Sequence, residues 1–283
     1  MRTFDRNTAS IEDMRRHVRF WPVVVLSVLA GLTPFAKSFG QDDVNPDEII
    51  RRFAEKETEF REVWAHYAYT EQIRFQVLDR EGNAKEQRDI TMDVYFTTEG
   101  ERKTEIVADR GELFSVQVSP EDLSDATGMQ PFVLTTEQLP NYKIEYIGKE
   151  RVDELDTYVF DVEPRDMKPG QRYFKGRIWV DDVDLQIVMS RGKIKPDSST
   201  NKFPEFETVR QQVDGKYWFP TWTKAEDVLT FGSRFSVGSI FGGGSRNFQR
   251  VHVRQYINYE DFKKFEVGTS IHFGDDPEPG NRP

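Results

Sequence analysis

From residue 67 to residue 257, apolar and polar side chains alternate with a period of two in one segment after another. One such segment places Tyr67, Tyr69, Ile73, Phe75 and Val77 on one side and mostly polar residues on the other. This period puts the apolar side chains on one face of a β-strand. Strands with one apolar and one charged face are typical of an antiparallel sheet that meets water on one side.

The turns between these segments agree with an antiparallel arrangement. Asp214-Gly215 separates EFETVRQQV from KYWFPTW, and this dipeptide between alternating segments is the strongest short-range signal for a hairpin. Residues 181–184 link two further strands in the same way. We expect about ten strands, and a sheet of that size tends to curl. The predicted fold is mainly β (α+β): a curled antiparallel sheet forming an open or half β-barrel, with a hydrophobic cavity covered by a few helices.

One long amphipathic helix precedes the strands. The run Asn45-Pro46-Asp47-Glu48 supplies a capping residue, a proline for the first turn and two acids at the positive end of the helix dipole. Apolar residues then recur at helical spacing, which predicts a helix over residues 46–62. Shorter helical pieces are expected near residues 120–126, 136–139 and 260–265.

The N-terminal segment has the three parts of a secretory signal. Three arginines precede an apolar run over residues 20–32, and the small residues Ser38 and Gly40 stand at −3 and −1 of a cut before Gln41. The run is short for a membrane span, although an uncleaved N-terminal anchor is an alternative. Met14 is an alternative start to Met1. We therefore expect an N-terminal extension plus signal peptide (1–40), a single domain (41–273) and a disordered acidic tail (274–283).

Composition excludes several classes of function. The chain has a formal charge of −10 and no cysteine. An acidic surface repels phosphate backbones, which argues against nucleic acid as a partner. Without cysteine there is no disulfide, no thiol catalysis and no lipid-anchoring cysteine. The histidines and the acidic turn at 181–184 lack the spacing of metal ligands, so neither a metal nor another cofactor is expected.

Three segments together resemble a known group. They are YFKGRIWVDDVDLQIVMSRGK (173–193), FETVRQQVDGKYWFPTW (206–222) and YINYEDFKKF (256–265). These motifs resemble the outer-membrane lipoprotein-sorting superfamily, the LolA/LolB/RseB-like proteins of double-membraned bacteria, over residues 44–273. The resemblance implies an unclosed barrel with a helical lid, a cavity that receives acyl chains, a periplasmic location and no catalysis. The arginine that latches the lid in true carriers has no assigned counterpart here.

The resulting hypothesis is a monomeric periplasmic carrier for lipoprotein acyl chains or lipids, with envelope membrane proteins as further partners. Two alternatives stay open: a non-catalytic sensor or scaffold that binds another protein, and an envelope hydrolase. No catalytic residue is assigned. Mid-strand apolar residues are the predicted cavity wall, although an inward-facing strand residue more often belongs to a packed core than to a ligand wall. They are Tyr69, Ile73, Phe75, Val94, Phe96, Phe160 and Ile178.

Overall fold

The computed structural model describes residues 45–97, 101–196, 205–213, 215–232 and 248–264, all within one compact unit of residues 44–283. The expected signal peptide and acidic tail lie outside these ranges. None of the helices in the described ranges is long and apolar enough to cross a membrane.

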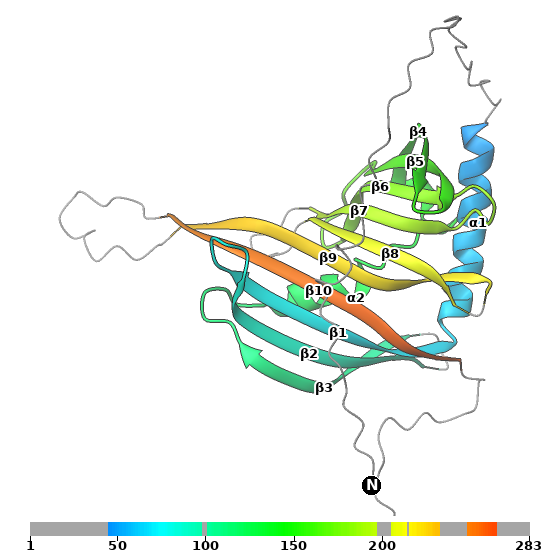
Figure 1. Ribbon diagram of the computed structural model, residues 1–283. Helices are drawn as coiled ribbons and strands as arrows, with labels where there is room; N and C mark the ends of the chain where they lie inside the picture. Colours follow the sequence, from blue (N-terminus) through cyan, green and yellow to red (C-terminus); the bar gives the residue numbers. More distant parts are fainter. Residues whose placement is uncertain (1–44, 98–100, 197–204, 214, 233–247, 265–283) are drawn as a thin grey trace, which may run out of the picture. The chain divides into compact units, whose positions relative to one another are not determined.

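Within the described ranges, ten antiparallel strands form one sheet, accompanied by two α-helices and a short 3-10 turn (Figure 1). The elements are α1 (Pro46–Trp64), β1 (Tyr67–Leu78), β2 (Ala84–Phe96), β3 (Arg102–Glu112), α2 (Pro120–Gly128), η2 (Leu139–Asn141), β4 (Tyr142–Val152), β5 (Leu155–Pro164), β6 (Tyr173–Asp181), β7 (Ile187–Lys195), β8 (Glu205–Val213), β9 (Tyr217–Gly232) and β10 (Phe248–Lys264). The strand order is β3-β2-β1-β10-β9-β8-β7-β6-β5-β4. Because β3 and β4 are the two ends of this order, the sheet over the described residues is curled but not closed, as the alternation predicted.

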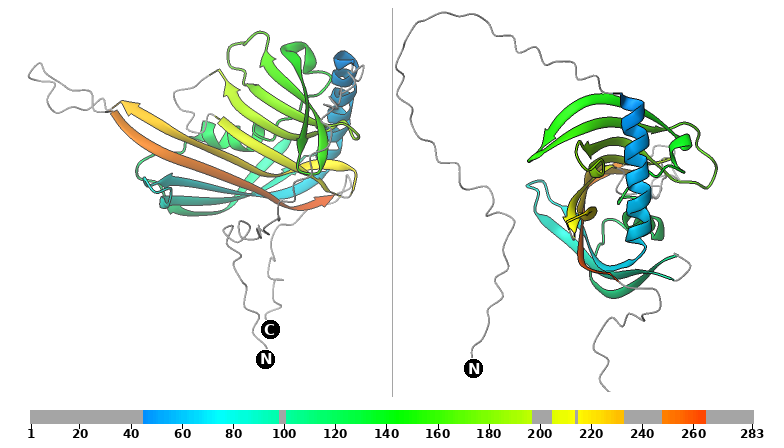
Figure 2. Two further views of the ribbon diagram at one scale, coloured as in Figure 1. Left: turned by 45° about the horizontal axis from the view of Figure 1, so that its top comes forward. Right: turned by 90° about the vertical axis from the view of Figure 1, so that its right-hand side faces the viewer.

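The long helix forms where its capping signals predicted it. The Asn45 side chain accepts a hydrogen bond from the Glu48 N–H at 3.3 Å, and Pro46 fills the first turn. The observed end, Trp64, lies two residues beyond the predicted one. Figure 2 shows α1 across one end of the curled sheet, with α2 on the concave side. The face of α1 that meets the sheet carries Ile49, Phe53, Ala54, Phe60 and Trp64.

Most of the apolar interior is a single cluster on the concave side of the sheet. It joins α1, α2 and strands from both ends of the sheet, with ring contacts such as Phe53–Phe160 at 5.4 Å and Phe60–Phe219 at 5.2 Å. A second, smaller cluster around Trp179 involves residues that alternate with the inward ones, and therefore lies on the convex side. The concave side is thus the main hydrophobic core.

Two sequence predictions about turns had different outcomes. The hairpin at Asp214-Gly215 is confirmed, because β8 and β9 pair up to Val213 and Tyr217 on either side of it. The helix expected near residues 260–265 is wrong, because β10 continues as a strand through Lys264. Asp261 has φ +57° and the register with β1 shifts between Ala68 and Thr70, which marks a β-bulge. The bulge breaks the two-residue alternation and so imitates helical spacing.

Candidate functional site

The seven residues predicted to line a cavity all belong to the concave core. Six are buried with at most 1% of their surface exposed, and Phe96 is partly buried against the same cluster. The six are Tyr69, Ile73, Phe75, Val94, Phe160 and Ile178. The structure brings them together, but their neighbours are mainly other core side chains. Only Tyr69 and Phe96 line an open pocket, and contact of the others with a ligand stays a prediction.

That pocket has a volume of about 700 Å³ and lies where the sheet stays open. Its wall includes Arg102 from β3, the first strand of the order, and Tyr142 from β4, the last. The last two turns of α1 form another side, and residues 127–138, at the end of α2 and after it, form a third. Two sides of the pocket are therefore the end strands β3 and β4, which a closed barrel would have paired.

Aromatic and aliphatic side chains supply much of the pocket's surface. The Trp64 ring packs against Phe60 at 5.2 Å and against Tyr69 at 5.9 Å, so the pocket wall continues directly into the core. The apolar lining residues are Trp64, Ala65, Tyr69, Phe96, Met129, Pro131, Phe132, Val133 and Tyr142. Pockets of roughly 300–1,000 Å³ with mostly apolar walls and a few polar groups are the usual form of small-molecule sites.

Sequence reasoning missed the residues that α1 and the 127–138 segment contribute. Trp64 stands four residues after Phe60, so helical spacing places both on one face of the helix. This spacing would have extended the predicted helix by two residues and placed Trp64 in the wall. Residues 129–135 have neither helical nor strand period. Their place in the wall depends on tertiary contacts alone.

One buried ion pair closes the side of the pocket next to β1. Arg102 Nη2 donates to Glu71 Oε1 at 2.8 Å and contacts the Tyr69 hydroxyl at 3.4 Å. Burial raises the pKa of the Glu71 carboxyl to about 7, against the lowering effect of Arg102. Glu71 occupies an inward position of β1 between Tyr69 and Ile73. The alternation in the sequence therefore predicts that it lies on the apolar face.

A second buried ion pair fastens α1 to the sheet. Glu57 Oε1 accepts from Arg210 Nη1 at 3.0 Å and from the Ile187 N–H at 3.0 Å. Arg210 also donates to the Phe132 carbonyl oxygen, and its guanidinium lies over the Phe60 ring at 4.9 Å. One arginine on β8 thus holds both walls of the pocket, the helix and the segment after α2.

Polar side chains hold the start of the segment after α2, at Gln130, on the concave face of the sheet. The amide groups of Gln130 and Gln255 exchange hydrogen bonds, with Gln255 Nε2 donating at 3.0 Å. Thr208 donates to the Gln130 carbonyl at 2.9 Å and contacts Thr223 at 2.7 Å. These contacts lie across β8, β9 and β10, so the segment is positioned by side chains rather than by secondary structure of its own.

The buried carboxylates do not converge on one cleft in the described part of the chain. Glu57 pairs with Arg210, Glu71 pairs with Arg102, and Asp125 pairs with Arg172. Each of these three has an arginine of its own, and the other buried carboxylates, Asp93, Asp122 and Asp181, accept hydrogen bonds from Thr70, Ser119 and the N–H groups of residues 183 and 184. These are structural contacts rather than the arrangement of a two-carboxylate site.

The sequence matches no protein-family model and no curated protein. Solved structures show a distant likeness. A putative outer membrane lipoprotein-sorting protein domain from Vibrio parahaemolyticus matches with a TM-score of 0.41 and 13% identity, over 80% of this chain and 95% of that one. A LolA superfamily protein from Nitrosomonas europaea matches with a TM-score of 0.35 and 13% identity, over 78% and 94%.

The complex of MucA and MucB from Pseudomonas aeruginosa matches with a TM-score of 0.22 and 12% identity, over 71% of this chain and 93% of that one. The first two neighbours carry names of the superfamily that the sequence motifs resemble. All three TM-scores lie below 0.5, and no inference about the function of this chain follows from them.

Proposed function

We propose that this chain is an exported, non-enzymatic carrier that holds the acyl part of a lipid or of a lipid-modified protein in the pocket beside α1. The observation that carries the proposal is the pocket itself: about 700 Å³, walled by aromatic and aliphatic side chains, and continuous with the core at the opening of the sheet. The resemblance of the strand motifs to the lipoprotein-sorting superfamily supports the same function. It also supports a periplasmic location and a single domain over residues 41–273.

Burial of methylene groups provides the binding energy in this mechanism. Each buried CH₂ contributes about 0.8 kcal/mol, so the roughly twelve methylenes of a long acyl chain contribute about 10 kcal/mol before the cost of association and ordering is subtracted. The ligand needs no covalent step and leaves by the route through which it entered.

Entry and release require a wall to move, and the contacts of α1 indicate which one. Glu57 holds the middle of the helix through Arg210, while Glu59 accepts from the Tyr217 hydroxyl at 2.7 Å and from Lys216 at 3.0 Å. The final turn, with Arg61 and Trp64, carries no further ion pair in the described residues. Thr58 on α1 also accepts from the Thr136 N–H at 3.0 Å. We infer that the final turn of α1, beyond these contacts, moves to admit the ligand.

Native mass spectrometry of the chain from Gln41 onward, purified from a double-membraned bacterial host, tests this function. Gly128 lines the pocket, and a Cβ added there meets nothing within 4 Å, so we expect Gly128→Phe to place a ring at the pocket wall and reduce the space for a ligand. We expect co-purifying lipid or acylated peptide in the wild type and its loss in Gly128→Phe. Ala84→Phe, at an exposed position outside the pocket, is the matched control and keeps the ligand.

A ligand-free wild type that also takes up no fluorescent fatty acid at micromolar concentration contradicts the carrier function. N-terminal sequencing of the exported protein tests the signal separately, with Gln41 as the expected first residue. A retained N-terminus in the membrane fraction favours the uncleaved anchor.

A second candidate, a scaffold that binds another protein, is favoured by edge strand β3. Ile106 and Val107 on this strand are 52% and 51% exposed, and Phe114 shortly after it is 79% exposed. An exposed edge with apolar side chains can pair with an extended segment of a partner. A photo-crosslinking residue at position 106 in intact cells should then give an adduct with an envelope protein, whereas its absence contradicts this candidate.

A further inference from the structure

We propose that Arg61 makes the pocket selective for amphiphiles with an anionic oxygen head group, a carboxylate or a phosphate, on an alkyl or acyl chain. This inference rests on the proposed function and adds the chemistry of the ligand's polar end. Among ligands with the same apolar chain, Arg61 on α1 then decides which head group binds most tightly.

The three arginines of the pocket wall differ in how far their charges are already neutralised. Arg102 is paired with Glu71, and Arg172 is paired with Glu121 and Asp125. Arg61 makes no ion pair with any residue that the structure describes. A guanidinium carries five N–H donors and no acceptor, so an oxyanion is its natural complement.

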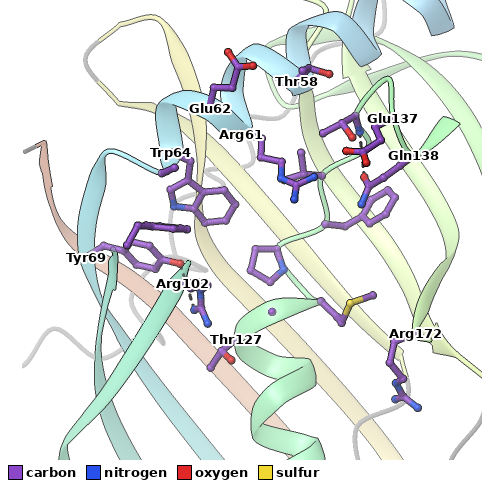
Figure 3. A pocket seen from close by; sticks show the side chains of 18 of the residues that line it. Thr58, Arg61, Glu62, Trp64, Tyr69, Arg102, Thr127, Glu137, Gln138 and Arg172 are labelled. Carbon is purple, nitrogen blue, oxygen red and sulfur yellow. Dashed lines mark hydrogen bonds between the residues drawn. The ribbon is translucent and has the colours of Figure 1, made fainter. Parts of the chain in front are cut away.

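The position of Arg61 directs this charge toward the ligand. Figure 3 shows its side chain extending from α1 toward the segment after α2, into the space between the two walls. Trp64 lies one turn further along the same side of the helix. Its ring and that of Phe132 make the adjacent wall apolar. Arg61 itself is exposed, so the charge interaction has the strength of a partly screened surface pair.

The acids of the wall oppose this preference only in part. Glu62 and Glu137 also line the pocket, but Figure 3 shows Glu62 on the opposite side of the helix from Arg61, pointing away. The lining therefore carries three cationic and two anionic side chains in a chain of charge −10. Glu137 is the one acid that competes with an anionic head group for Arg61.

Ligands with one chain and different heads separate this inference from simple apolar binding. We would measure the displacement of a neutral probe, a pyrene-labelled fatty alcohol, by dodecanoate, dodecyl phosphate, dodecanol and dodecylamine below their micellar concentrations. For the wild type we expect the two anions to bind about fivefold more tightly than dodecanol, as for a partly exposed charge pair, and dodecylamine to bind most weakly. The order of dodecanoate and dodecyl phosphate distinguishes a fatty acid from a phospholipid head.

Substitutions at Arg61 and its neighbours sharpen the test. Arg61→Gln should remove the preference for anions without changing dodecanol affinity, and Arg61→Lys should retain part of it. Glu137→Gln should increase the preference about twofold, because it removes the competing acid. Arg52→Gln, an exposed arginine of the same helix outside the pocket, is the matched control and should change nothing. Circular dichroism melts confirm that each variant folds.

Two results overturn the inference and differ in meaning. Equal affinity of the wild type for dodecanoate and dodecanol, unchanged in Arg61→Gln, overturns the role of Arg61 and leaves the carrier function standing. Failure of every ligand and of the probe to bind the wild type overturns the carrier function itself, and the inference with it.

Discussion

Among the described residues, two ion pairs join a fully buried glutamate to an arginine, and they differ in how many of the glutamate's hydrogen bonds are made. In the pair that fastens α1, both Glu57 oxygens accept hydrogen bonds, with the Ile187 N–H as an additional donor to Oε1. In the pair beside the pocket, Glu71 Oε2 has no hydrogen-bond partner in the described residues. Arg102 in that pair is also partly exposed, whereas Arg210 is not.

This difference separates a fully satisfied ion pair from one that leaves a buried carboxylate oxygen without a partner among the described residues. A buried polar atom without a partner costs about 1–3 kcal/mol, and most folded chains avoid it. Two other unpartnered buried atoms, Trp64 Nε1 and Thr135 Oγ1, belong to residues of the pocket wall. Among the described residues, the pocket wall and the ion pair beside it therefore hold three unpartnered buried polar atoms, whereas both oxygens of Glu57, in the middle of α1, are satisfied.

The largest expected effect breaks the complete pair. Arg210→Met leaves Glu57 buried without its cation and removes the donor to the Phe132 carbonyl, so we expect a loss of about 3–5 kcal/mol in the free energy of unfolding. Arg102→Met should lose less, about 1–2 kcal/mol, because Glu71 can take up a proton. Urea denaturation of both variants at pH 6 measures this. Equal losses would contradict the distinction between the two pairs.

The next effect is a pH dependence that belongs to Glu71. Its folded-state pKa of about 7 lies above the usual 4.5, so the folded state binds more protons than the unfolded state between these values. The contribution of Glu71 to stability is therefore fully present below pH 4.5 and is lost as the pH rises through 7, by about 3 kcal/mol at most. Glu71→Gln should flatten this part of the stability–pH curve, and Glu55→Gln on the exposed face of α1 should not. If the wild type instead became more stable from pH 4.5 to 7, and Glu71→Gln removed that rise, the raised pKa assigned to Glu71 would be wrong.

A smaller effect of opposite sign is expected at the surface contact of α1. Hydrogen bonds from Tyr217, Lys56 and Lys216 lower the pKa of Glu59 to about 2. This contribution is present above pH 4.5 and is lost as the pH falls toward 2. Because the side chain is more than a third exposed, we expect only about 1 kcal/mol. Stability measured from pH 5 to pH 2 in Glu59→Gln and in the wild type tests this. Identical stability–pH curves would show that the Glu59 contact contributes nothing.

The smallest effect compares two threonines of the pocket wall. The Thr127 hydroxyl donates to the Leu123 carbonyl at 3.0 Å, whereas the Thr135 hydroxyl is unpartnered in the described residues. Thr127→Val should lose about 1 kcal/mol, and Thr135→Val should be neutral or gain up to about 1 kcal/mol. Thermal melts of the ligand-free variants measure both. A loss at Thr135 equal to that at Thr127 would show that its hydroxyl is satisfied in solution.

Local patterns were sufficient for most of the fold and for little of the site. The cap at Asn45, the strand alternation and the Asp214-Gly215 turn each depend on neighbours in sequence, and each prediction was confirmed. The bulge at Asp261 imitated helical spacing, because the shifted register is set by pairing with β1. At the pocket, Tyr69 and Phe96 were predicted, but the wall formed by residues 127–138 was not, since no period marks it.

By itself the sequence determined an antiparallel, mainly β chain with one amphipathic helix and one apolar side to its strands. These follow from the period of side chains along the backbone, which is a local property. Only the tertiary structure decided that most of the predicted cavity residues are packed core and that the open space lies at the gap between β3 and β4. The pocket is the space that remains when the side chains on the concave side do not fill the volume enclosed by the curved sheet. That space depends on all the packed elements together, so no single segment encodes it.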